Sequence, residues 1–118
     1  MIKDLVQRLQ DKGKRMIEIR RHLHEYPELS FHETETPKYI ANFYKDKDCK
    51  VETNIGQHGV KVTIDSGKPG KTIAIRADFD ALPIQEETDL SFASKNEGVM
   101  HACGHDAHTA YMLSLIHI

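Results

Sequence analysis

Residues 100–109, with the sequence MHACGHDAHT, place three histidines, a cysteine and an aspartate within ten positions. Cys103 and His105 are two positions apart, so an extended segment would project both side chains to the same side. A thiolate and an imidazole together are typical ligands of zinc or another first-row divalent ion. Because a metal ion needs three or four protein ligands, these two residues would begin a metal site that other segments complete.

Two other interpretations of this segment stay open. Cys103 would precede a helix N-terminus, where the helix dipole favours the thiolate, so it is a candidate nucleophile with His105 or His108 as its base. Alternatively, the cluster has no chemistry. His101 and His108 would then be surface or capping residues, Asp106 would complement the helix dipole, and the cysteine would be a small buried hydrophobe. The spacing favours metal binding, although C-x-H lacks the second ligand pair that makes a zinc signature specific.

A second pair of candidate residues lies in IRADFDALP, residues 75–83. Asp78 and Asp80 follow an apolar run and are again two positions apart. In α/β sheets, active sites collect at the carboxyl ends of strands, where carboxylates bind metal ions or orient the ligands. The alternative is that both aspartates only solubilise the end of a strand and start a turn, which is the commoner case for an isolated pair.

Hydrophobic periodicity predicts the helices that would position these residues. Residues 2–24 predict an amphipathic helix, and Pro27 disfavours its continuation. A second helix is predicted over about 36–46, with Thr36 as its N-cap and Pro37 at its first helical position.

Strands are predicted after the second helix. Residues 49–55 and 59–65 alternate apolar and polar side chains, which predicts a hairpin. Residues 71–79 are more continuously apolar, which predicts a strand buried on both faces of a sheet. A helix is predicted from about Gly104 onward. The order of helices, strands and helix predicts an α/β fold.

Composition limits the class of protein. The chain has 118 residues, the length of one modest domain, and its net charge of −2 gives no indication of nucleic-acid or membrane-surface binding. No apolar run reaches the roughly 20 residues of a membrane helix, and the N-terminus has no signal-peptide pattern. Two cysteines, Cys49 and Cys103, make no disulfide framework. We therefore expect a cytoplasmic protein, with no nucleic-acid or membrane partner.

Three segments resemble a known family. IRADFDALPIQE at 75–86 and GVMHACGHDAHTA at 98–110 resemble the paired signature of the aminoacylase/hippurate hydrolase/N-acyl-amino-acid amidohydrolase family of metallopeptidases. IRRHLHEYPELSFHETET at 19–36 resembles the N-terminal segment of that family. The resemblance runs from about Ile17 to Tyr111 and is specific for the family, but not for the substrate.

The resemblance implies that residues 1–118 are the N-terminal portion of a three-layer α/β/α catalytic domain, incomplete here. The rest of that domain and an inserted lid domain, which usually dimerises, would be absent. It also implies one or two divalent ions (Zn, Mn, Co or Ni) and the hydrolysis of small N-acyl amino acids by a homodimeric whole protein. The 118 residues alone are expected to be inactive.

Carried over residue by residue, Cys103 and His105 match the metal ligands of the family. Asp80 matches the acidic residue that orients the metal site. Asp78 stands where relatives in the wider clan have a ligand histidine. Three further residues match motif positions that support the ligands or have a structural role: His101, Asp106 and His108.

Some features depart from the family pattern. The family takes its remaining ligands and a glutamate base from sequence after the cysteine–histidine motif, and Glu86–Glu87 belongs to the earlier motif instead. We expect His22 and His24, near the end of the first helix, to be structural. Two alternatives to the amidohydrolase remain: a hydrolase that uses Cys103 as its nucleophile, and a non-enzymatic metal-binding or interaction module.

Overall fold

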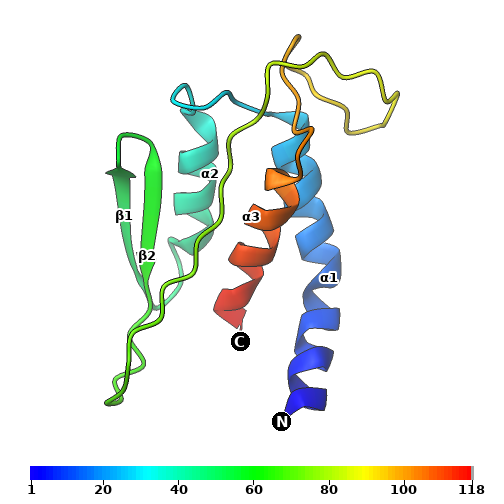
Figure 1. Ribbon diagram of the computed structural model, residues 1–118. Coiled ribbons are helices and arrows are strands. Elements are labelled where there is room, and N and C mark those ends of the chain that lie inside the picture. The colour runs from blue at the N-terminus through cyan, green and yellow to red at the C-terminus, as the bar shows by residue number, and fades with distance from the viewer. Residues whose placement is uncertain (118) are drawn as a thin grey trace.

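The computed structural model describes residues 1–117 of the chain, as helices and one hairpin (Figure 1). In chain order the elements are α1 (Ile2–Glu25), α2 (Glu35–Tyr44), β1 (Lys50–Ile55), β2 (Gly59–Thr63), α3 (His105–Ser114) and the short 3-10 helix η1 (Leu115–His117). The predicted first helix, hairpin and last helix are therefore confirmed, with ends that differ by a few residues.

The core lies where α1, α2 and α3 meet. α1 and α3 run side by side, with α2 next to them (Figure 1). Ile19 and Leu23 are four residues apart on α1 and are buried against Leu113 of α3. The core is completed from α2 by Ile40 and Tyr44.

The N-terminus of α2 is held by a carboxylate from the preceding loop. Glu28 accepts hydrogen bonds from the backbone N–H groups of Thr34, Glu35 and Thr36 at 2.8, 3.1 and 2.6 Å. Burial opposes ionisation of this carboxyl, but the hydrogen bonds outweigh it and lower the pKa of Glu28 to about 2. The prediction of Thr36 as N-cap is wrong, because Thr34 holds that position and Glu28, six positions before it, satisfies the free N–H groups.

The hairpin packs one face on the helices. β1 and β2 pair antiparallel, with Val51 opposite Val62, and the register shifts between Glu52 and Ile55. Val51, Val60 and Val62 pack against the core cluster. The alternation of apolar and polar residues therefore marked the correct inner face.

The prediction of a buried strand over 71–79 is wrong for the described residues. The segment runs past β2 and α3 without strand pairing (Figure 1). Ile73 is 84% exposed and Ile75 is 63% exposed. The apolar pattern specifies a segment covered on two faces, but no described residue supplies the neighbouring strand. With parts of β2 and α3, this segment lines an apolar cavity of about 350 Å³.

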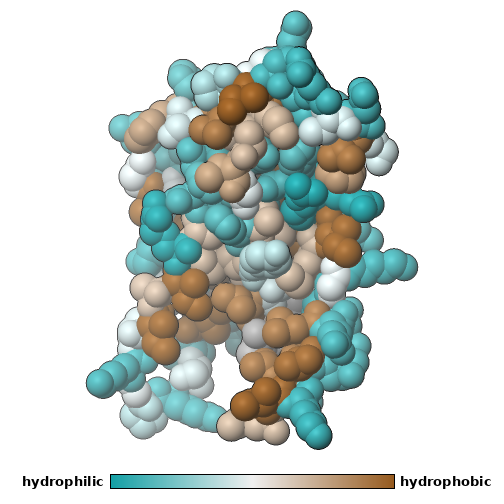
Figure 2. Space-filling model, turned by 45° about the vertical axis from the view of Figure 1, so that its right-hand side comes forward, coloured by the Kyte–Doolittle hydropathy of each residue, from teal (hydrophilic) through white to brown (hydrophobic). Residues whose placement is uncertain are grey.

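Apolar side chains also reach the surface. Figure 2 shows hydrophobic residues gathered in the lower half of one face, with hydrophilic residues at its margins. Over the described residues, none of the helices combines the length and apolar character needed to cross a membrane.

Candidate metal centre

Isolated backbone bridges bring the two signature segments together. Leu82 and Met100 form an antiparallel bridge, with N–H to carbonyl distances of 2.9 and 3.0 Å in the two directions. Ala81 pairs in parallel with Leu29, and its N–H donates to the carbonyl of Glu28 at 2.8 Å. These bridges fix the segment after Asp80 beside the segment that leads into α3.

His105 and Asp80 meet at this junction. Nδ1 of His105 lies 2.9 Å from the backbone carbonyl oxygen of Asp80 and 3.0 Å from its carboxylate Oδ1. Because a carbonyl oxygen only accepts hydrogen bonds, Nδ1 carries the proton, and this contact assigns the tautomer. Nε2 then keeps a free lone pair, which is the state that a histidine needs to bind a metal ion.

Gly104 separates the two candidate ligands and shapes the turn between them. Its φ of +102° lies in the left-handed region, and α3 begins at the next residue, His105. Cys103 is exposed, so the interpretation of this cysteine as a small buried hydrophobe is wrong. The turn leaves the thiol accessible just before a helix N-terminus.

The other predicted residues lie around this junction in different settings. The carboxylate of Asp78 pairs with exposed Arg76 at 2.5 Å, while its backbone carbonyl accepts from the Thr109 hydroxyl at 2.8 Å. His108 is exposed, with its ring centroid 5.9 Å from that of His105. The structure therefore brings Asp80 to His105, but turns Asp78 toward an arginine.

His101 is buried beneath the cluster. It is 5% exposed, and its Nδ1 has no hydrogen-bond partner among the described residues. Burial lowers the pKa of His101 to about 4, although Asp106 acts in the opposite direction, so the ring is neutral near pH 7. Its interpretation as a surface or capping residue is wrong.

The donors fit part of a metal site. Cys103 offers a thiolate, His105 a correctly protonated imidazole, and Asp80 a supporting carboxylate. Within residues 1–117, however, no group of three or more histidine, cysteine, aspartate or glutamate side chains is arranged to hold a metal ion. Further ligands would have to come from outside the described residues.

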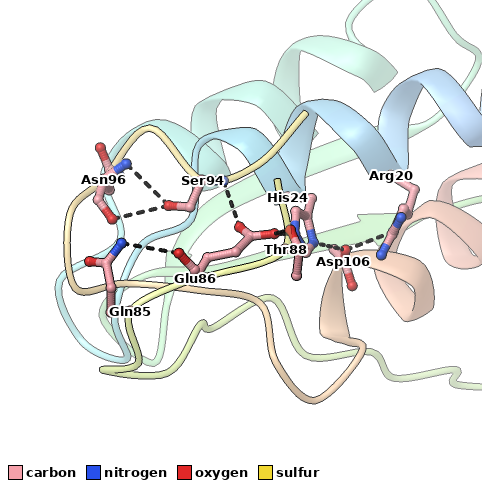
Figure 3. Close-up of polar contacts among 8 residues, drawn as sticks. All are labelled: Arg20, His24, Gln85, Glu86, Thr88, Ser94, Asn96 and Asp106. Carbon is pink, nitrogen blue, oxygen red and sulfur yellow. Dashed lines mark hydrogen bonds and ion pairs between the residues drawn. The ribbon is translucent and has the colours of Figure 1, made fainter. Parts of the chain in front are cut away.

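A network of charged side chains, buried except for the partly exposed Arg20, connects α1 with the start of α3 (Figure 3). His24 lies between two carboxylates, with Nδ1 2.8 Å from Asp106 Oδ2 and Nε2 2.9 Å from Glu86 Oε1. Arg20 Nε reaches the same Asp106 oxygen at 2.8 Å. The sequence did not predict this network. The one available signal was that Arg20 and His24 are four residues apart in the predicted first helix, so their side chains share a helix face.

Glu86, the last residue of the first signature segment, forms one end of this network. Burial raises its pKa, but hydrogen bonds from Thr88, His24 and the Ser94 N–H outweigh burial and lower the pKa of Glu86 to about 2. Its oxygens lie 2.6 Å from Thr88 Oγ1 and 2.6 Å from the Ser94 nitrogen. Glu86 is thus engaged by neighbours on both oxygens, in keeping with the expectation that it is not the catalytic base.

Sequence comparison relates the chain to metallopeptidases and amidohydrolases. Residues 74–118 match peptidase family M20/M25/M40. The chain is 46% identical over 114 residues to the N-acyl-L-amino acid amidohydrolase of Geobacillus stearothermophilus, covering 96% of this chain and 31% of the relative. It is 51% identical over 100 residues to the N-acetyl-L-cysteine deacetylase of Bacillus subtilis (strain 168), covering 85% of this chain and 24% of the relative.

Solved structures share the fold over the matched part. One from methicillin resistant Staphylococcus aureus is 73% identical with a TM-score of 0.94, covering 98% of this chain and 31% of that one. The YXEP protein of Bacillus subtilis, a dinuclear metal binding peptidase from the M20 family, is 48% identical with a TM-score of 0.81, covering 88% and 30%. The chain spans 24–31% of the length of these relatives. With its mixed α/β fold and three signature segments, the chain is similar over nearly its whole length to amidohydrolases and peptidases, and its residues 74–118 match peptidase family M20/M25/M40.

Proposed function

We propose that the whole protein is a metal-dependent amidohydrolase that removes the acyl group from N-acyl amino acids. The observation that carries the proposal is the contact between His105 Nδ1 and Asp80, which leaves Nε2 free in a residue two positions after the exposed Cys103. The relatives named N-acyl-L-amino acid amidohydrolase and N-acetyl-L-cysteine deacetylase support this class of substrate.

Each residue of the junction has a role in this proposal. Cys103, as thiolate, and His105, through Nε2, would hold one or two divalent ions (Zn, Mn, Co or Ni). A bound ion would lower the pKa of a water from 15.7 toward ~7 and polarise the acyl carbonyl. The Asp80 carboxylate accepts the Nδ1 proton of His105, which fixes the ring orientation and makes Nε2 more basic.

The remaining groups belong to the proposal for the whole protein. Residues 1–118 would form the N-terminal portion of the catalytic domain. The other ligands and a glutamate base, which takes a proton from the water and gives it to the leaving amine, would lie outside them. A lid domain would join two copies into a dimer. The 118 residues by themselves are expected to bind a metal ion weakly and to be inactive.

Metal removal tests this function directly. The whole protein is assayed with N-acetyl and N-benzoyl amino acids before and after chelation, and again after divalent ions are added back. We expect chelation to abolish turnover and the ions to restore it, and the Cys103→Ala/His105→Ala double variant to lose metal binding and activity together. Turnover that survives chelation but is lost on thiol alkylation would instead establish a cysteine hydrolase.

A further inference from the structure

The network of Arg20, Asp106, His24 and Glu86 (Figure 3) contains none of the proposed metal ligands, but Asp106 directly follows His105 in the sequence. The side chains of His24, Asp106 and Glu86 are 3%, 1% and 2% exposed. Removing such groups from water is costly unless each is paired. Their hydrogen bonds therefore have to be complete, and the geometry shows how they are completed.

Both ring nitrogens of His24 are engaged by carboxylates. Nδ1 faces Oδ2 of Asp106 and Nε2 faces Oε1 of Glu86. Arg20 reaches the same oxygen of Asp106 from α1. His24 therefore connects the two carboxylates, and the four side chains form one continuous network.

The network of Arg20, Asp106, His24 and Glu86 joins the segments that carry Asp80 and the candidate ligands. Asp106 directly follows His105 in the first turn of α3, and its Oδ2 is bound by both Arg20 and His24 of α1. Glu86, at the other end, belongs to the signature segment that includes Asp80. Side chains of α1 therefore bind both segments that meet at the contact between Asp80 and His105.

We propose that His24 and Glu86 are positioning residues for the metal centre: through Asp106 they fix the turn that presents Cys103 and His105. This inference rests on the proposed function. It predicts that replacing Glu86, at the end of the network far from the ligands, weakens metal binding. Glu86 itself touches neither candidate ligand in the structure described.

Glu28 provides a matched control. Like Glu86, it lies in a loop, collects several hydrogen bonds and has its pKa lowered to about 2. Its carboxylate, however, holds the N-terminus of α2 rather than the turn before α3. Glu28→Gln should therefore lower stability as Glu86→Gln does, without altering the metal centre.

The experiment titrates the metal-free whole protein with Co²⁺ against a competing chelator. Three quantities are measured for each variant: the Kd for Co²⁺, the absorption of thiolate-bound Co²⁺, and the midpoint of urea unfolding without metal. We expect Glu86→Gln to weaken Co²⁺ binding by about 10- to 100-fold and to change the absorption spectrum. Glu28→Gln should shift only the unfolding midpoint.

The outcomes separate the inference from the function beneath it. If wild type binds no Co²⁺, or binds it unchanged after Cys103 and His105 are both replaced by alanine, the proposed function fails. If wild type binds Co²⁺ through those residues but Glu86→Gln keeps its affinity and spectrum, only the positioning role is overturned.

A milder variant keeps the test decisive where Glu86→Gln does not fold. Arg20 is partly exposed and reaches Asp106 from the opposite side, so Arg20→Gln loosens the same carboxylate. Arg15, on the same helix, forms its ion pair among the described residues with exposed Glu18, away from Asp106, and provides the control. We expect Arg20→Gln, but not Arg15→Gln, to weaken Co²⁺ binding; equal affinities would refute the positioning role.

Discussion

Two glutamates, Glu28 and Glu86, show how this chain uses carboxylates inside the structure. Each accepts hydrogen bonds from a hydroxyl and from at least one backbone N–H, and each has a pKa lowered to about 2. Because these hydrogen bonds favour the ionised form, the contribution of each residue to stability depends on pH.

Glu28→Gln tests this dependence. The pKa of Glu28 falls from an ordinary 4.5 to about 2 on folding. The ionised carboxylate therefore stabilises the fold above about pH 4.5, and this contribution is lost as the pH falls toward 2. At pH 7 we expect the variant to lose about 0.5–2 kcal/mol, the cost of a lost helix cap.

Urea unfolding at pH 7, 4 and 2.5 measures the effect. The difference between wild type and Glu28→Gln should shrink steadily as the pH falls. Glu35→Gln is the control, because Glu35 is exposed and pairs only with Lys38 among the described residues. A difference that stays constant from pH 7 to 2.5 would show that the charge of Glu28 contributes nothing.

The residues in and around the candidate site differ in how well the amino-acid sequence alone identifies them. Cys103 and His105 stand out because a thiol and an imidazole at this spacing favour a metal site, although C-x-H by itself is not a specific signature. His24 and Glu86 do not, since their importance comes from buried contacts across the sequence: His24 meets Asp106, 82 positions away, and Glu86 meets His24, 62 positions away. Local spacing carries no information about such a contact.

The start of α3 is the element that sets the distance between the candidate ligands. Gly104 adopts φ +102°, and a Cβ built on it would meet no atom within 4 Å. Any other residue there would be strained by its backbone conformation rather than by a clash. The turn therefore depends on glycine for conformational reasons alone.

Gly104→Ala is expected to destabilise the protein by about 1–2 kcal/mol, the cost of a left-handed conformation for an L-residue. Gly13→Ala is an opposite control. Gly13 lies inside α1 with no atom within 4 Å of a built Cβ, so alanine there should stabilise by about 0.5–1 kcal/mol. Thermal unfolding of both variants gives the two signs. A neutral Gly104→Ala would mean that the turn relaxes out of this conformation.

The helices and the hairpin could be predicted because their patterns are completed locally. α1 buries one stripe, and β1 and β2 find each other across a short turn. The segment 71–79 has an equally clear apolar pattern, yet it forms no strand in the described structure. A strand needs a partner, and the sequence of one segment does not say whether a partner is present.

The molecule is therefore tightly packed between its helices and loosely packed along residues 71–79. The helices enclose a small core that includes Leu113, which is 1% exposed, while Ile73 and Ile75 project from a segment with no strand neighbour. No backbone N–H of residues 71–80 donates to another backbone group in the described part of the chain. Stability should therefore respond very differently to changes in these two regions.

Two single substitutions in the 118-residue chain test this difference in packing. Leu113→Ala removes buried methyl groups and should cost about 2–5 kcal/mol of unfolding free energy. Ile73→Ser replaces a residue that is 84% exposed and should stay within about 0.5 kcal/mol of wild type. Denaturant unfolding at two protein concentrations measures both. A large, concentration-dependent cost for Ile73→Ser would show that this segment is covered in solution by another copy of the chain, since unpaired apolar segments are templates for strand addition.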